Sequence, residues 1–224
     1  MVKGIGATLW ADLDEQQKRI LTACRDEFLE LGQTDPRLRS NALLFAGVAN
    51  FMMDDKPKMY EAFQQAADGD PEGTAALETM VGFLANDREW VKALEAAEVI
   101  MQRQPSGTAY SWIGRIYAEQ KKWSQAEKAF RVALSYDDVQ GIANLGLGVV
   151  LLKSGAEPDK ARVPLQIARY ELAGQPEALM AWGVLLVLEG DEEGGKRYVN
   201  RAVALLPASP GRDAVAKEFG IAVE

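Results

Sequence analysis

Apolar and polar residues follow a helical period through residues 108–138. Residues spaced by three or four share one face of an α-helix, so this pattern predicts two amphipathic helices. A polar break at Lys121–Lys122 separates them and is short enough to join an antiparallel pair. The residues that define the two faces are Ile113, Gly114 and Tyr117 in the first run and Trp123, Ala126, Phe130 and Ala133 in the second.

The same pattern recurs about every 34 residues. A glycine or small residue in the first helix of each pair would let the second helix approach closely; this series is Gly47, Val81, Gly114, Gly148 and Gly183. The residues of the second helix expected at the matching contact are Met59, Ala93, Ala126, Ala161 and Gly195. One turn later, the residues expected to insert into the core between the helices are Phe63, Ala97, Phe130, Leu165 and Val199. Short polar breaks within the pairs are expected near Asp54–Asp55, Asn86–Asp87, Lys121–Lys122, Ser154–Gly155 and Gly190–Asp191.

These residues and their period resemble the tetratricopeptide repeat (TPR) family. The resemblance covers residues 38–209 and indicates five repeats, at about 40–73, 74–106, 107–140, 141–175 and 176–209. It implies an all-α fold, a right-handed superhelical array of antiparallel helix pairs in which stacked pairs share one continuous core. The lack of any alternating strand pattern agrees with an all-α chain.

Two terminal segments flank the predicted repeats. Residues 1–37 include an amphipathic helix from Leu13 to Leu31, expected to cover the open end of the first repeat, with Cys24 as an inert small hydrophobe on its apolar face. Residues 210–224 include a short polar helix, Pro210 to Phe219, expected to cap the other end. Asp35–Pro36 and Asp70–Pro71 are predicted to be the N-cap and first residue of the helices that follow.

Three repeats depart from the regular pattern. Repeat two has Val81 in place of the glycine. Pro164 falls inside the second helix of repeat four, where a proline should kink the helix or delay its start. Gly194 and Gly195 occupy alanine positions in repeat five, and each weakens helix propensity by about 1 kcal/mol.

Composition narrows the possible functions. The chain of 224 residues has a net charge of −8, which repels phosphate backbones and anionic lipid, so neither nucleic acid nor a membrane is an expected partner. It has no histidine and one cysteine, and no apolar run long enough to span a bilayer. The N-terminus lacks the apolar region of a signal peptide, so a cytoplasmic location is expected.

Gly146-Leu-Gly148 faintly resembles a phosphate-binding turn, but it follows no predicted strand and is explained by helix packing. The sequence therefore predicts no enzyme, metal or cofactor.

The resemblance also implies a binding surface, because the first helix of each TPR unit lines a concave groove. The Lys/Asn/Arg set that clamps a partner's terminal carboxylate in some members is missing, and most residues carried over are apolar. Arg115 and Glu78 are expected to set the polar register of a bound segment. The candidate partner-binding residues are Leu44, Val48, Phe51, Glu78, Ser111, Arg115, Leu145, Val149, Leu152, Met180, Val184 and Val187.

Three functions remain open at this stage. The favoured hypothesis is a protein-interaction module, an adaptor or secretion-type chaperone, that holds an apolar or amphipathic partner segment in the groove. The second is a structural scaffold that self-assembles into a homo-oligomer through its apolar inner face. The third, an enzyme, would need a cofactor or a second subunit.

Overall fold

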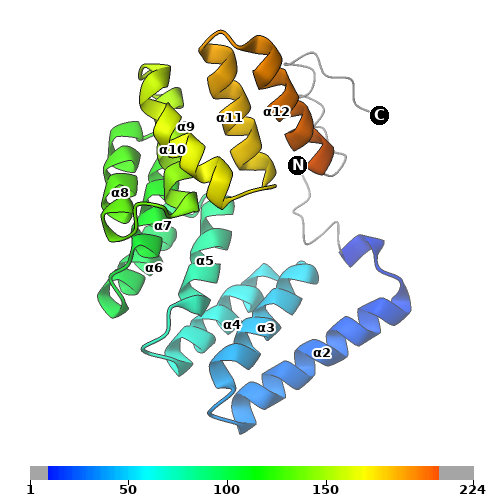
Figure 1. The fold of residues 1–224 in the computed structure, drawn as a ribbon. Coiled ribbons are helices and arrows are strands. Elements are labelled where there is room, and N and C mark those ends of the chain that lie inside the picture. Colours follow the sequence, from blue (N-terminus) through cyan, green and yellow to red (C-terminus); the bar gives the residue numbers. More distant parts are fainter. Residues whose placement is uncertain (1–9, 207–224) are drawn as a thin grey trace. The chain divides into compact units, whose positions relative to one another are not determined.

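The computed structural model describes residues 10–206, and every regular element in that range is an α-helix. The chain divides into two compact units, residues 1–105 and 106–224 (Figure 1). The all-α prediction is confirmed.

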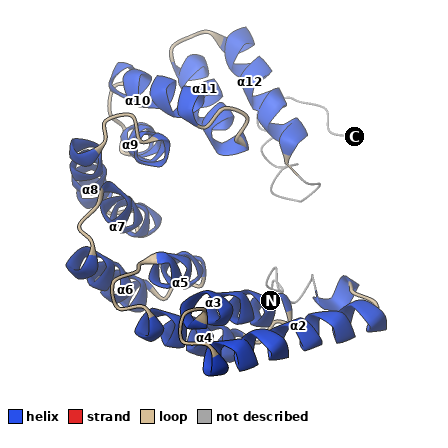
Figure 2. Ribbon diagram, turned by 60° about the horizontal axis from the view of Figure 1, so that its bottom comes forward, coloured by secondary structure: helices blue, strands red, loops and turns tan. Residues whose placement is uncertain are grey.

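The first unit contains one long helix followed by two helix pairs. Helix α2 packs against α3, α3 pairs with α4, and α5 pairs with α6. Figure 2 shows these helices joined by short loops. The helices of this unit are α2 (Glu15–Thr34), α3 (Arg39–Met52), α4 (Lys56–Gly69), α5 (Ala75–Asn86) and α6 (Trp90–Arg103).

The second unit contains three helix pairs stacked in order. Pairs α7–α8, α9–α10 and α11–α12 each form a hairpin, and α8 and α10 carry the packing from one hairpin to the next. The helices are α7 (Gly107–Glu119), α8 (Trp123–Tyr136), α9 (Gly141–Lys153), α10 (Pro158–Glu171), α11 (Pro176–Leu188) and α12 (Glu192–Leu205). Each predicted repeat therefore corresponds to one hairpin.

All five hairpins turn in the same way. Each turn has one residue in the left-handed backbone region, and these residues lie in or beside the predicted polar breaks. They are Asp54, Arg88, Lys121, Gly155 and Gly190, with φ of 59°, 62°, 57°, 77° and 92°. Glycine adopts this region without steric cost, whereas other residues do so rarely. The predicted breaks are confirmed, and their shared geometry gives the five hairpins one common turn.

The close approach predicted between paired helices is present, but the predicted partners of three glycines are wrong. Gly47, Gly114 and Gly148 meet residues one turn beyond the predicted ones, namely Phe63, Phe130 and Leu165. A Cβ atom added to Gly47 would lie 2.4 Å from Phe63, and one added to Gly148 would lie 2.4 Å from Leu165. In repeat two the sizes are exchanged, because Val81 in the first helix is matched by Ala97 in the second, and both are fully buried. At this contact the larger residue therefore lies in the second helix of repeat one and in the first helix of repeat two, and the total side-chain size stays similar.

Two predicted helix starts are wrong. Asp35 and Asp70 follow the ends of α2 and α4, and the next helices begin only at Arg39 and Ala75. Each carboxylate instead accepts a hydrogen bond within the connecting loop, from the Arg37 N–H at 2.9 Å and the Gly73 N–H at 3.0 Å. The two aspartate side chains therefore accept hydrogen bonds from loop N–H groups and do not cap a helix. Aspartate commonly forms such local hydrogen bonds in turns.

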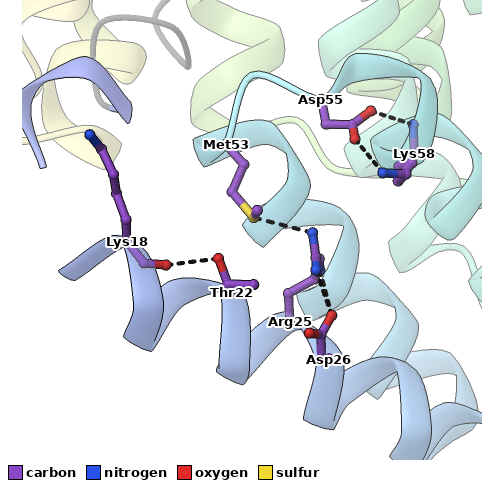
Figure 3. Close-up of polar contacts among 7 residues, drawn as sticks. All are labelled: Lys18, Thr22, Arg25, Asp26, Met53, Asp55 and Lys58. Carbon is purple, nitrogen blue, oxygen red and sulfur yellow. Dashed lines mark hydrogen bonds and ion pairs between the residues drawn. The ribbon is translucent and has the colours of Figure 1, made fainter. Parts of the chain in front are cut away.

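Helix α2 docks on α3 through few apolar contacts. Phe28 stacks on Phe45 with ring centroids 5.3 Å apart, and Nη1 of Arg25 lies 3.7 Å from the Met53 sulfur (Figure 3). Ile20 is 55% exposed, and Cys24 is exposed as well. The expectation that Cys24 would be an inert hydrophobe on a covered face is therefore wrong.

The irregular repeats still form complete helices. Helix α10 begins at Pro158 and continues through Pro164, so the proline does not delay its start. In α12, Gly195 meets the Gly183 carbonyl oxygen, which would lie 2.6 Å from an added Cβ. This contact explains why glycine replaces alanine there. The predicted capping helix of residues 210–219 lies outside the described residues.

Candidate functional site

The second unit has an apolar groove beside α9. We call it the second-unit groove; its volume is about 350 Å³. Ile142, Leu145 and Val149 of α9 are spaced three and four apart, so they form one stripe along the groove. Ile142 is 52% exposed, and Leu145 and Val149 are half-buried. The other lining residues are Arg115, Ala118, Glu119, Phe130, Gly146, Val150, Leu172, Gln175 and Glu177.

Glycines of α9 shape this groove. A Cβ added to Gly146 would lie 2.3 Å from the Phe130 ring, so only glycine lets α9 approach α8 this closely at that point. The Phe130 ring is 1% exposed and forms the floor. Asn144 fixes the start of α9, because its side-chain amide donates to the Asp138 carbonyl oxygen at 2.8 Å. The apolar stripe is therefore held by a rigid, well-packed helix.

Charged residues border the apolar stripe. The guanidinium of Arg115 lies 4.5 Å from the Trp112 ring centroid, a cation–π distance. Burial beside this ring lowers the pKa of Arg115, and the charge of Glu119 opposes that effect. Glu177 contributes a further carboxylate at the start of α11. The groove thus has an apolar centre with one cation and two anions at its edges.

The structure distributes the predicted second-unit residues unevenly. Arg115, Leu145 and Val149 line the groove together. Ser111 does not, because it is 4% exposed, and its hydroxyl oxygen lies 2.8 Å from Gln140 Oε1 and 2.9 Å from the Gly107 carbonyl oxygen. Its polar group has internal partners, which gives Ser111 a structural role between α7 and the start of α9.

The remaining predicted residues of this unit lie elsewhere on α9 and α11. Leu152 packs against the hydrophobic core of the unit, and Met180 and Val184 are half-buried on α11. Val187 packs in the α11–α12 hairpin, where its Cγ2 would lie 2.4 Å from a Cβ on Gly195. None of these four residues lines the second-unit groove.

The predicted residues of the first unit lie in different surroundings. Val48 is exposed and Leu44 half-buried, while the Phe51 ring packs 4.6 Å from the Phe83 ring. Glu78 accepts a hydrogen bond from the Thr74 hydroxyl at 2.9 Å, so its carboxylate stabilises the start of α5.

Comparison with known proteins rests on the fold. No family model matches the sequence, and no curated protein sequence matches it. Among solved structures, TTC0263, a TPR protein of Thermus thermophilus, superposes with a TM-score of 0.65 at 19% identity, over 80% of this chain and 98% of that one. The chain has the TPR fold.

Two further TPR-fold structures extend the comparison. PilW, described as a type IV pilus biogenesis factor, matches with a TM-score of 0.66 at 16% identity, over 96% of this chain and 99% of that one. YrrB, described as a TPR protein with an unusual peptide-binding site, matches with a TM-score of 0.51 at 13% identity, over 85% of this chain and 97% of that one.

The repeat positions explain why some residues that line the second-unit groove were not predicted. Glu119 lies one residue beyond the groove position Ala118 on α7, while Leu172 and Gln175 lie in the connection after α10, outside any first helix. The repeat pattern carries no signal for these loop residues. Gly146 did mark the groove in the sequence, because a second glycine two residues before Gly148 has no counterpart in the other repeats.

Two kinds of feature are absent from the described part of the chain. Residues 10–206 contain no group of three or more His, Cys, Asp or Glu side chains that could hold a metal ion. In the same range, no helix is long and apolar enough to cross a membrane.

Proposed function

We propose that this chain is a non-enzymatic protein-interaction module that binds an apolar or amphipathic segment of a partner protein in the second-unit groove. The observation that carries the proposal is the exposed stripe Ile142, Leu145 and Val149 on a rigid helix, bordered by charged side chains. Covering apolar surface contributes about 25 cal/mol per Å², and the charges at the edges give orientation.

The chemistry of the groove defines the partner segment. Its apolar side chains would cover the α9 stripe, an acidic group would face Arg115, and basic groups would face Glu119 and Glu177. The TPR fold supports this reading, since YrrB of the same fold is described as having a peptide-binding site. An adaptor and a secretion-type chaperone would both use such a groove, and the identity of the captured protein distinguishes them.

The test is capture by the full chain before and after a charge is placed in the groove. Partners are first identified by pull-down from the native lysate and mass spectrometry, and binding of the purified partner is then measured. Val149→Glu should weaken binding more than tenfold, because it buries a carboxylate against an apolar segment. Val163→Glu is the matched control, since Val163 is 63% exposed on α10 and lies outside the groove.

Circular dichroism must show that both variants keep their helices. Unchanged capture by folded Val149→Glu would contradict the groove proposal. Light scattering across a dilution series tests the scaffold alternative, because a concentration-dependent dimer that Val149→Glu abolishes would assign the groove to self-assembly instead.

A further inference from the structure

The first unit has a cleft of about 490 Å³ that the repeat pattern did not predict. We call it the first-unit cleft. It lies between α4 and α6, and Leu77, Met80 and Leu84 of α5 form its floor. These three residues share one face of α5, and Glu78, the predicted groove residue, points from a different face. The cleft is thus distinct from the predicted concave surface.

Repeat five has a smaller pocket in the equivalent place, of about 330 Å³. Its lining residues Leu186, Arg197, Tyr198 and Arg201 match Leu84, Glu95, Ala96 and Val99 of the first-unit cleft, and aromatic side chains narrow the space. There Trp182 and Tyr198 meet edge to face with ring centroids 6.5 Å apart. The Arg169 guanidinium lies 4.9 Å from the Trp182 centroid and 5.5 Å from that of Tyr198, and its Nη1 donates to the Tyr198 hydroxyl at 2.7 Å. An aromatic pair and a cation therefore occupy this position in the second unit.

Smaller residues stand at the matching positions of the first unit. Met80 precedes Val81 as Trp182 precedes Gly183, and Ala96 precedes Ala97 as Tyr198 precedes Val199. The residue that matches Arg169 is Ala67. Met80 and Ala96 both line the first-unit cleft. The shorter side chains at these positions accompany the larger volume of the first-unit cleft, about 490 Å³ against about 330 Å³ in repeat five.

The charges around the cleft favour a basic ligand. Glu61 and Glu95 occupy the same repeat position on α4 and α6, and both are exposed at the edge of the cleft. Glu61 also accepts a hydrogen bond from the Gln65 side-chain amide at 3.2 Å. Lys92 and Arg103 line the cleft as well, and with Glu89, the partner of Lys92, three carboxylates stand against two cations. Lys92 pairs with Glu89 at 3.4 Å, and Arg103 Nη1 donates to three main-chain carbonyl oxygens at the end of α4 and in the following loop, at 2.9 to 3.1 Å.

We propose that the first-unit cleft is a second docking site, which binds an aromatic side chain of a partner protein segment next to a lysine or arginine. The aromatic ring would occupy the space above Met80 and Ala96, and the basic residue would face Glu61 and Glu95. The ligand would restore the aromatic and cationic contacts that repeat five makes internally. This site is independent of the second-unit groove.

The experiment observes the methionine methyl groups of the full chain by NMR after 13C labelling. The probe is the tripeptide N-acetyl-lysyl-tryptophanyl-lysinamide. The Met80 methyl signal should shift on titration, because Met80 lies in the cleft, while that of Met180 on α11 should stay unchanged and serve as an internal control. Replacing the central tryptophan by alanine, or both lysines by glutamates, should remove the shift.

Two variants locate the binding. Ala96→Tyr places in the cleft the residue that repeat five has, and should weaken probe binding at least tenfold, whereas Ala204→Tyr at an exposed position of α12 should leave it unchanged. The double change Glu61→Gln and Glu95→Gln should weaken it about two- to fivefold per carboxylate, as for exposed ion pairs.

Either of two results would overturn the docking site: no Met80 shift with the tryptophan probe, or a shift of the same size with the alanine probe. If Ala96→Tyr does not fold, the surface pair Glu61→Gln and Glu95→Gln decides, and undiminished binding by that variant would also overturn it. Loss of the Met80 shift has no bearing on the second-unit groove, which the Val149→Glu comparison tests separately.

Discussion

The close contact between Gly47 and Phe63 allows a sharp test of how the helix pairs pack. A Cβ added to Gly47 would lie 2.4 Å from Phe63 Cε1, whereas carbon atoms in contact normally lie about 3.5–4.0 Å apart. The Phe63 ring is fully buried and stacks on Phe83 at 5.6 Å, so it has no free space into which to move. Gly47→Ala should therefore overpack the α3–α4 hairpin.

The expected magnitude is a balance of two effects. Overpacking costs up to about 3 kcal/mol when the neighbour cannot yield. Alanine is about 1 kcal/mol more favourable than glycine inside a helix. Gly47→Ala should therefore lower the free energy of unfolding by about 2 kcal/mol. In a Phe63→Ala background the ring is absent, so the same change should raise it by about 1 kcal/mol. The coupling between the two sites is then about 3 kcal/mol.

Urea unfolding followed by far-UV circular dichroism measures all four proteins of the cycle. Ala23→Gly, at an exposed position within α2, reports the helix-propensity effect alone in the same unit. The decisive result is the reversal of sign. If Gly47→Ala stabilises the wild-type protein, or has the same effect in both backgrounds, the glycine is not required by the Phe63 ring and the small-to-large explanation of the repeat fails.

Three other predictions concern polar groups. Ser111→Ala removes the contact with Gln140 and should lower the free energy of unfolding by about 1 kcal/mol in urea, while leaving partner capture unchanged. Arg103→Met leaves three carbonyl oxygens without their donor and should cost about 1.5–3 kcal/mol in the same assay. Burial and Asp87 raise the pKa of Tyr60 above its usual 10.0, so the folded state holds the phenol proton more tightly than the unfolded state. Stability should then fall as pH rises above 10, by up to about 1.4 kcal/mol per pH unit, and urea titrations from about pH 9 to about pH 11 should show a smaller fall for Tyr60→Phe.

The repeat fold could be predicted because its signal recurs. Gly47, Gly114, Gly148 and Gly183 lie where a second helix approaches closely, as predicted, although the side chain that meets the first three lies one turn beyond the expected residue. A departure at one position, such as Val81 in place of glycine, does not obscure a period that the other repeats carry. The prediction of the fold therefore depended on many weak observations that agree.

Helix starts and site residues lacked this redundancy. Asp70 before Pro71 fits a helix N-cap locally, yet the carboxylate binds the Gly73 N–H and α5 begins at Ala75. Val187 has the repeat position of a groove residue, but glycine at position 195 draws it into the α11–α12 hairpin. In both cases one neighbouring residue decides the outcome, and a repeat average does not contain that information.

A comparison of matched positions separates packing contacts from open surfaces. At the hairpin contact, Gly47 with Phe63 becomes Val81 with Ala97: one residue grows as the other shrinks, and the interior stays filled. At the first-unit cleft the exchange is not compensated, because Met80 and Ala96 are both smaller than Trp182 and Tyr198, and the cleft of about 490 Å³ is larger than the matching pocket of about 330 Å³ beside Tyr198. Since protein interiors are close-packed, an uncompensated loss between neighbouring helices leaves space that only solvent or another molecule can fill. Paired changes of size in the same direction therefore indicate candidate binding sites in a repeat array, and paired changes in opposite directions indicate core.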